Sequence, residues 1–146
     1  MTLAESVDLL IVEDNPNDLE LTLRALRKNK VSITIQTVKD GAEALDYLFS
    51  RGHFASRTHQ MPRVIFLDLK LPKVDGMEVL HQIKANERTR SIPVVMLTSS
   101  QQDRDVIESY RLGVNSYIVK PVDFSKFADS IAQLGLYWIG LNHPNR

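Results

Sequence analysis

Cysteine is missing from all 146 residues of the sequence. Its absence excludes disulfide bridges, thiolate metal ligands and a cysteine nucleophile, and it is compatible with a reducing compartment. No apolar stretch approaches the length of about 20 residues that a membrane-spanning helix needs. The first eight residues carry two acids, whereas a secretory signal begins with a basic segment and an apolar run. We therefore expect a cytoplasmic protein.

The sequence also lacks a net charge. It has 18 basic and 18 acidic residues, so no excess of either sign suggests binding to nucleic acid or to a membrane surface. Its length suits one folded domain with its own hydrophobic core. We expect residues 1–146 to form a single domain with no separate output domain.

One stretch organises the rest of the sequence. Val64 to Leu67 are four apolar residues in succession, which predicts a strand buried on both faces of a parallel sheet. Asp68 is then the first polar residue at the carboxyl end of this strand. Ligands bind at the carboxyl ends of strands in open α/β sheets, so Asp68 is placed for chemistry. An Asp that only ends a strand is the alternative for this residue taken alone.

Three other predicted strands end in the same way. The apolar run 9–12 is followed by Glu13 and Asp14, the run 92–97 by Thr98, and the run 116–119 by Lys120. The alternating residues 32–38 predict a half-exposed strand at a sheet edge. Residues 50–62 form an extended loop before the central strand, with room for a helical turn.

Helical stripes separate these strands. Asn15 and Pro16 suit the cap and first position of a helix, and Gly76 suits a helix that approaches the sheet closely. Five strands alternating with five helices predict an α/β fold with a doubly wound parallel sheet and helices on both faces. The last two stripes are Val106, Ile107 and Tyr110, and then Phe124, Phe127, Ile131, Leu134 and Trp138.

The polar strand ends predict one site. Glu13, Asp14, Asp68, Thr98 and Lys120 converge at one edge of such a sheet. Three neighbouring carboxylates repel each other unless a cation neutralises them, and hard oxygen ligands favour Mg²⁺ or Mn²⁺ over zinc. With a metal and an ammonium group present, the Asp68 carboxylate can attack a phosphoryl group.

Each of these residues has a structural alternative. Glu13 and Asp14 suit the first turn of a helix, Thr98 suits a helix cap, and Lys120 suits a solvated strand end. All four alternatives together would require independent strand ends to present complementary groups by accident. We therefore favour a phosphoryl-transfer site.

These motifs resemble the receiver domain of two-component response regulators. The shared pattern is an acidic pair, an Asp 30 residues before a Thr, and Lys120-Pro121 22 residues after that Thr, with Tyr117 as an aromatic in the last strand. The resemblance implies a flavodoxin-like sheet with strand order 2-1-3-4-5 and no enzymatic activity beyond slow self-dephosphorylation. It also implies that Asp68 accepts a phosphoryl group from a sensor histidine kinase.

The resemblance further assigns the other residues. Glu13, Asp14, Asp68 and the backbone carbonyl of Lys70 would hold Mg²⁺, for which Mn²⁺ can substitute. Thr98 and Lys120 would contact the phosphoryl group, and Thr98 with Tyr117 would form the switch. Glu13 departs from the Asp that many receivers have at this position, and its longer side chain suits contact with the metal through water.

The long loop and the Lys120–Phe124 run are similar to response regulators of cyanobacterial phytochromes, which makes a phytochrome one candidate kinase. The main rival is a pseudo-receiver that binds partners without being phosphorylated. A phosphatase of the haloacid-dehalogenase kind would need an acid at Lys70, and a flavodoxin-like electron carrier would need a phosphate-binding loop in place of Glu13 and Asp14.

The signal is expected to leave by protein contact. Phosphorylation would draw Thr98 inward and let Tyr117 turn into the vacated space. Leu136, Tyr137 and Ile139 lie off the inner stripe of the last helix, which predicts a homodimer through a face that includes this helix.

Overall fold

A computed structural model of the chain describes residues 7–29, 32–57, 60–99 and 111–136. Five parallel strands form one sheet in the order β2-β1-β3-β4-β5. The predicted fold class and strand order are confirmed. The strands are β1 (Leu9–Val12), β2 (Ile35–Val38), β3 (Val64–Asp68), β4 (Val94–Thr98) and β5 (Ser116–Val119).

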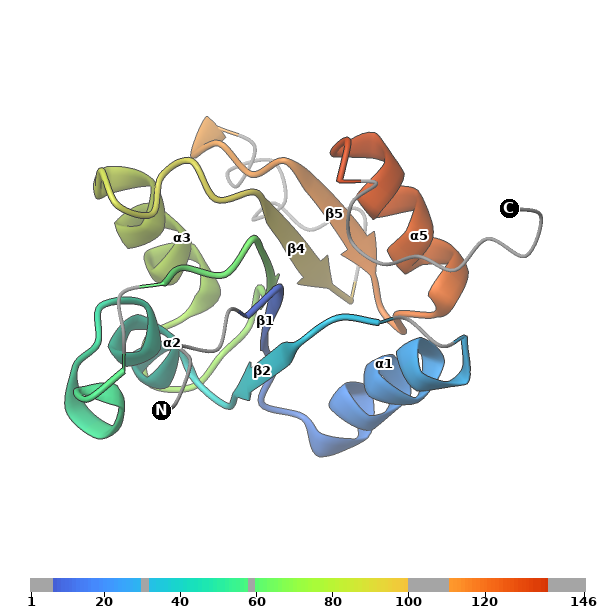
Figure 1. Cartoon of the computed structure of the whole chain (residues 1–146), viewed down its shortest axis with the longest axis horizontal. Helices are drawn as coiled ribbons and strands as arrows, with labels where there is room; N and C mark the ends of the chain where they lie inside the picture. The colour runs from blue at the N-terminus through green and yellow to red at the C-terminus, as the bar shows by residue number, and fades with distance from the viewer. Residues whose placement is uncertain (1–6, 30–31, 58–59, 100–110, 137–146) are drawn as a thin grey trace, which may run out of the picture.

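Helices cover both faces of this sheet. In Figure 1, α2 and α3 lie on one side of the strands and α1 and α5 on the other. None of the helices in the described ranges is long and apolar enough to cross a membrane. The helix predicted around Val106 to Tyr110 lies outside the described residues. The described helices are α1 (Pro16–Lys28), α2 (Gly41–Leu48), α3 (Gly76–Ala85) and α5 (Phe124–Gln133).

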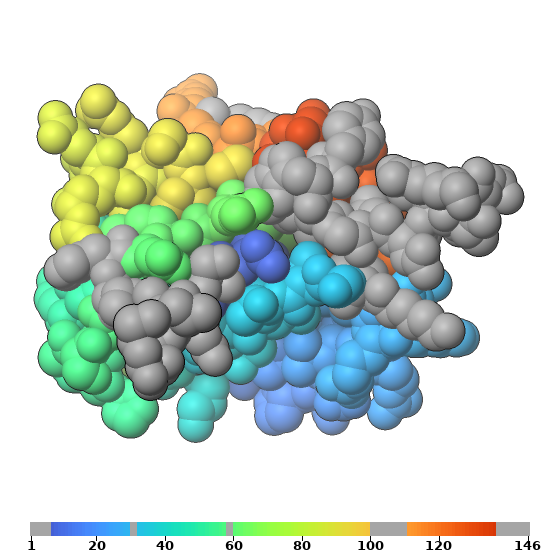
Figure 2. Space-filling view, in the orientation of Figure 1, coloured from blue at the N-terminus to red at the C-terminus, as the bar shows by residue number. Residues whose placement is uncertain are grey.

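The central strands are the most buried part of the chain. Every residue of β1, β3 and β4 is buried, which explains why their sequences are unbroken apolar runs. The edge strand β2 is mostly half-buried, as predicted for residues 32–38. Alternate strand residues face two hydrophobic clusters, one against α2 and α3 and one against α1 and α5. In the view of Figure 2, a small dark blue area from the described residues that lead into β1 reaches the surface, whereas the four residues of β1 are at most 1% exposed.

Each described α-helix begins at a side chain that caps it. Asn15, Asp40, Asp75 and Asp123 each accept hydrogen bonds from backbone N–H groups of the first turn. Pro16 follows Asn15 at the first helical position, as its fixed φ angle favours. These caps place the start of α1 and α3 directly beside the ends of β1 and β3.

An arginine makes several contacts within the described part of the loop between α2 and β3. It contains a short 3-10 helix, η1 (Gly52–Phe54). The guanidinium of Arg57 lies 3.9 Å from the ring centre of Tyr47 and donates to the backbone carbonyls of Tyr47 and Gln60. The stacking and the two hydrogen bonds tie this loop to the buried end of α2.

The last helix ends earlier than the sequence pattern predicts. Leu134 caps α5, and Gly135 follows with a φ of 71°. The turn brings Leu136 back into the cluster beneath α5, where it is 8% exposed. The placement of Leu136 on an outer face was therefore wrong, because the helical period does not continue through Gly135. Tyr137, Trp138 and Ile139 lie outside the described residues.

Gly76 lets α3 start against the end of the central strand. A Cβ atom at this position would lie 2.3 Å from the carbonyl oxygen of Asp68 and 2.5 Å from that of Leu69. Both neighbours are backbone atoms, which cannot rotate away. The loop that follows Asp68 therefore depends on a residue without a side chain.

We predict that Gly76→Ala lowers the free energy of unfolding by about 2 kcal/mol, since the added methyl group must displace backbone. Urea unfolding followed by circular dichroism measures this loss. His81→Ala, at an exposed position of the same helix, is the matched control and should change the stability little. A loss below about 0.5 kcal/mol for Gly76→Ala would contradict the close approach.

Candidate functional site

A pocket of about 190 Å³ opens at the carboxyl ends of the strands. Its lining comes from the segments that follow β1, β3, β4 and β5, so residues from distant parts of the sequence share one small space. The sequence-predicted residues Asp14, Asp68, Lys70, Thr98 and Lys120 line it. The remaining lining residues are Asn15, Asp18, Leu69 and Ser99.

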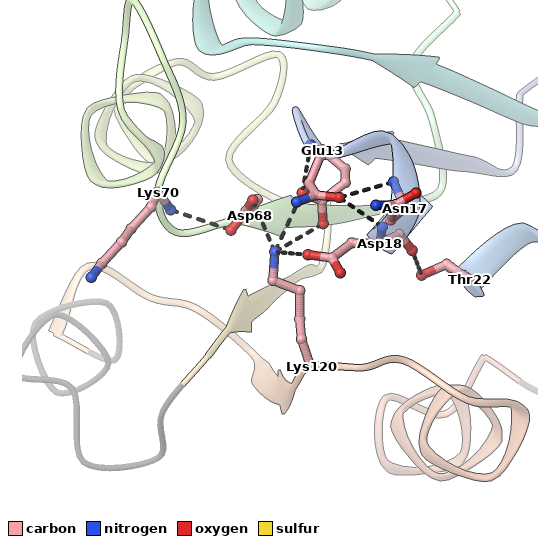
Figure 3. A network of polar contacts seen from close by, with 8 residues as sticks. Glu13, Asn17, Asp18, Thr22, Asp68, Lys70 and Lys120 are labelled. Carbon is pink, nitrogen blue, oxygen red and sulfur yellow. Dashed lines mark hydrogen bonds and ion pairs between the residues drawn. The ribbon is translucent and has the colours of Figure 1, made fainter. Parts of the chain in front are cut away.

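Lys120 is the centre of the polar contacts in this pocket. Its ammonium group donates to Asp68 Oδ2 at 3.2 Å, to Asp18 Oδ2 at 3.0 Å, and to the two carboxylate oxygens of Glu13 at 3.1 and 3.3 Å. Figure 3 shows Lys120 reaching from the end of β5 toward these three acids, while the ammonium group of Lys70 points away from Asp68. One cation therefore faces three carboxylates.

Two of these acids are withdrawn from water. Glu13 is 3% exposed and Asp68 is 4% exposed. Burial, the hydrogen bond with Asp68 and the charge of Asp68 together raise the pKa of Glu13 to about 7, with burial the largest cause. Lys120 and the backbone N–H of Asn15 oppose this rise. Glu13 is therefore protonated in part at neutral pH when only Lys120 balances the site.

The pKa of Lys120 shifts in the direction that keeps it charged. Burial alone would lower this pKa, but the hydrogen bond to Asp18 and the charges of Asp68 and Glu13 together raise it above its ordinary value. Its side chain is 15% exposed. The site thus holds a permanent ammonium group at its centre.

The acids at the ends of β1 and β3 form a group that suits a divalent cation. Glu13, Asp14 and Asp68 each offer a carboxylate oxygen, and these oxygens lie within 4.8 Å of one another. Asp14 is exposed at the mouth of the pocket, so an ion can enter from that side. A set of hard oxygen donors fits Mg²⁺ or Mn²⁺. Next to the set, the backbone N–H of Lys70 donates to Asp68 Oδ1 at 3.3 Å.

The two residues predicted to form a switch lie in different surroundings. Thr98 is buried at the end of β4 and lines the pocket. Tyr117 lies on β5 outside it, half-buried against the core cluster beneath α3 and beside a groove between β5 and α5. Both residues belong to adjacent paired strands, with Thr98 opposite Val119 and Met96 opposite Tyr117.

Sequence reasoning missed Asp18. It is the acid of the first turn of α1, and first-turn acids are common because they oppose the helix dipole. In the structure its carboxylate accepts the shortest hydrogen bond that the Lys120 ammonium group makes to the three acids. The sequence did contain a signal for Asp18. It lies only four residues after Asp14, in the first turn of a helix capped by Asn15, and this short spacing keeps it near the carboxyl edge of the sheet.

A 2-1-3-4-5 parallel sheet with an acidic pocket at its carboxyl edge defines the flavodoxin-like class of receiver folds. Residues 9–132 match the response regulator receiver domain. The chain therefore belongs to the receiver-domain family of two-component response regulators.

Two curated relatives cover nearly the whole chain. The probable methanogenesis regulatory protein FilR2 of Methanothrix harundinacea (strain 6Ac) is 42% identical, over 92% of this chain and 84% of its own length. The response regulator Rcp1 of Synechocystis sp. is 35% identical, over 90% of this chain and 88% of its own length.

Solved structures show the same fold. The bacteriophytochrome response regulator RtBRR is 55% identical, with a TM-score of 0.86 over 96% of this chain and 84% of its own. The Mn²⁺-bound form of Rcp1 is 34% identical, with a TM-score of 0.75 over 94% of this chain and 97% of its own. The phosphorylated cyanobacterial phytochrome response regulator RcpA is 37% identical, with a TM-score of 0.73 over 94% of this chain and 96% of its own.

The raised pKa of Glu13 predicts a pH-dependent stability. Between about pH 4.5 and pH 7 the folded protein keeps a proton on Glu13 that the unfolded chain releases, so the fold loses stability as the pH rises through this window. The loss is on the order of 3 kcal/mol. In Glu13→Gln this contribution disappears.

Urea unfolding in EDTA at pH 4.5 and pH 7.5 tests this prediction. Wild type should lose stability relative to Glu13→Gln as the pH rises, and Mg²⁺ at pH 7.5 should restore much of the loss. Glu43→Gln, at the start of α2 and away from the pocket, is the control and should follow wild type. A difference between wild type and Glu13→Gln that does not change with pH would contradict the assignment.

Proposed function

We propose that this chain is a response regulator that accepts a phosphoryl group on Asp68 from a sensor histidine kinase and signals by protein contact. The observation that carries the proposal is the contact between the buried Asp68 carboxylate and the Lys120 ammonium, beside two further carboxylates that suit Mg²⁺. The reaction needs a nucleophilic oxygen, a neutralising metal and a cation for the transferred oxygens.

The chemistry assigns one role to each group. An Asp68 oxygen forms the new bond to phosphorus, and the bond from phosphorus to the histidine nitrogen of the kinase breaks, so that the nitrogen keeps the electron pair. Mg²⁺ supplies charge neutralisation when it is held by Glu13, Asp14, Asp68 and the Lys70 carbonyl. Lys120 and the Thr98 hydroxyl would contact the phosphoryl oxygens.

A phytochrome is the candidate kinase. Support comes from the likeness to RtBRR and RcpA, whose names link them to bacterial and cyanobacterial phytochromes. The name of the relative FilR2 refers instead to methanogenesis regulation, so similarity to this family does not by itself select the kinase. The kinase assignment therefore rests on similarity, whereas the phosphoacceptor assignment rests on the pocket.

The pseudo-receiver and the phosphatase are the competing functions. A pseudo-receiver has no need for a buried Asp beside a lysine and two more acids, and this arrangement favours a phosphorylated protein. A phosphatase of the haloacid-dehalogenase kind needs an acid two residues after Asp68, where Lys70 stands with its ammonium group turned away (Figure 3). Receiver domains of response regulators are generally not enzymes.

The output is proposed to pass through the β5 side of the molecule. When Asp68 is phosphorylated, Thr98 would move toward the phosphoryl oxygens and Tyr117 would turn inward, which changes the surface beside β5 and α5. A homodimer through this surface is the expected result. We further propose a single cytoplasmic domain over residues 1–146 that binds neither nucleic acid nor membrane.

The phosphoacceptor prediction concerns Asp68→Asn. Incubation of wild type with acetyl phosphate and Mg²⁺ should add one phosphoryl group, and the variant should gain none because it lacks the nucleophilic oxygen. Intact-protein mass spectrometry measures the adduct. Asp46→Asn, an exposed acid that pairs with Arg51, is the matched control and should be labelled like wild type. Wild type without an adduct, under conditions that label a known receiver, would favour the pseudo-receiver.

The dimer prediction concerns molecular mass in solution. Wild type with acetyl phosphate and Mg²⁺ should elute as a dimer by size-exclusion chromatography with light scattering, and Asp68→Asn should have a smaller dimer fraction under the same conditions. Tyr117→Ala should weaken the dimer without reducing phosphorylation, since its side chain lies outside the pocket. A monomer in every condition would rule out this mode of output.

A further inference from the structure

The three acidic partners of Lys120 differ in whether they can also bind a divalent cation. Glu13 and Asp68 belong to the three carboxylates that lie within 4.8 Å of one another and suit a divalent cation. Asp18 is the partner outside this group in the described part of the chain. A bound cation would neutralise Glu13 and Asp68 and so weaken their attraction for Lys120, whereas Asp18 would keep its charge.

The position of Asp18 is set by the start of α1. The Asn15 side chain accepts hydrogen bonds from the backbone N–H groups of Asn17 and Asp18, at 2.9 and 3.0 Å. One turn later, the Thr22 hydroxyl donates to the Asp18 carbonyl at 3.2 Å. Figure 3 shows the Asp18 carboxylate turned toward Lys120 from this first turn. The Asp18 carboxylate is therefore held by the capped first turn of α1.

We propose that Asp18 is a positioning residue that holds the Lys120 ammonium inside the pocket, where it can meet a phosphoryl group on Asp68. The proposal rests on the proposed function. Asp18 Oδ2 and Asp68 Oδ2 both contact Lys120 Nζ. An ammonium group has three donor hydrogens, so Lys120 can keep Asp18 while it turns one donor from Asp68 to a phosphoryl oxygen. Without Asp18, Lys120 would be retained only by the acids that the metal needs.

Asp18 also has a simpler interpretation as a first-turn acid that stabilises the dipole of α1. The two interpretations differ in their dependence on Lys120. A dipole effect is the same whatever residue stands at position 120, whereas a positioning effect disappears when the ammonium group is removed. A double-mutant cycle between Asp18 and Lys120 therefore separates them.

The experiment measures the affinity for beryllofluoride, a phosphoryl mimic, in the presence of Mg²⁺ by isothermal titration calorimetry. Asp18→Asn should weaken binding about 10-fold, the size expected for one charge-assisted hydrogen bond. Asp18→Glu should recover most of the affinity because it restores the charge. In a Lys120→Met background, Asp18→Asn should change the affinity by less than about 2-fold, which is within the scatter expected of uncoupled sites.

Glu20→Gln is the matched control, because Glu20 lies on the exposed face of α1 and pairs with Arg24 and Arg27. It should bind beryllofluoride like wild type. An equal effect of Asp18→Asn in both backgrounds, or no effect in either, would overturn the role of Asp18 and leave the proposed function intact. Wild type that neither binds beryllofluoride nor gains a phosphoryl group would overturn the proposed function, and the role of Asp18 with it.

Discussion

The functional site depends on the ion cluster between Lys120 and the acids Glu13, Asp18 and Asp68. One positive charge faces three carboxylates, two of them buried, so the cluster carries a deficit of positive charge. The protein meets this deficit in part by raising the pKa of Glu13 to about 7. A divalent cation would remove the deficit, which gives the pocket an electrostatic preference for one.

The rest of the fold serves to bring these groups together. Glu13 and Lys120 are separated by 107 positions in the sequence, yet their side chains touch because β1 and β5 run parallel in one sheet. The buried strands β1, β3 and β4 tolerate almost no shift in register, since a shift of one residue would turn each buried side chain to the opposite face. The stability of the core therefore fixes the geometry of the pocket.

Close backbone contacts refine this placement. Gly76 allows α3 to begin against the carbonyls of Asp68 and Leu69, which shapes the loop beside the central acid. Asn15 holds the first turn of α1 and so the carboxylate of Asp18. These contacts are local and rigid, and they act on side chains that come from separate elements.

The strands and the residues at their ends could be predicted from the sequence because unbroken apolar runs that stop at a polar residue are a strong local signal. Asp68, Glu13 and Lys120 were found in this way. Asp18 was missed because a first-turn acid has an ordinary explanation, and its contact with Lys120 appears only in the folded chain. Leu136 was placed on the wrong face because a single left-handed residue, Gly135, ends the helical period. The neighbours of Tyr117 likewise depend on tertiary packing, which no local pattern encodes.

In the proposed function, Glu13, Asp14 and Asp68 form a divalent-cation site in which Lys120 is the second positive charge. Anomalous diffraction from crystals grown with Mn²⁺ tests it most directly. We expect one strong peak among the oxygens of Glu13, Asp14 and Asp68, with the Lys120 ammonium group still beside Asp18. A pocket without a peak, in which Lys120 keeps its contacts with Glu13 and Asp68 at saturating Mn²⁺, would contradict it.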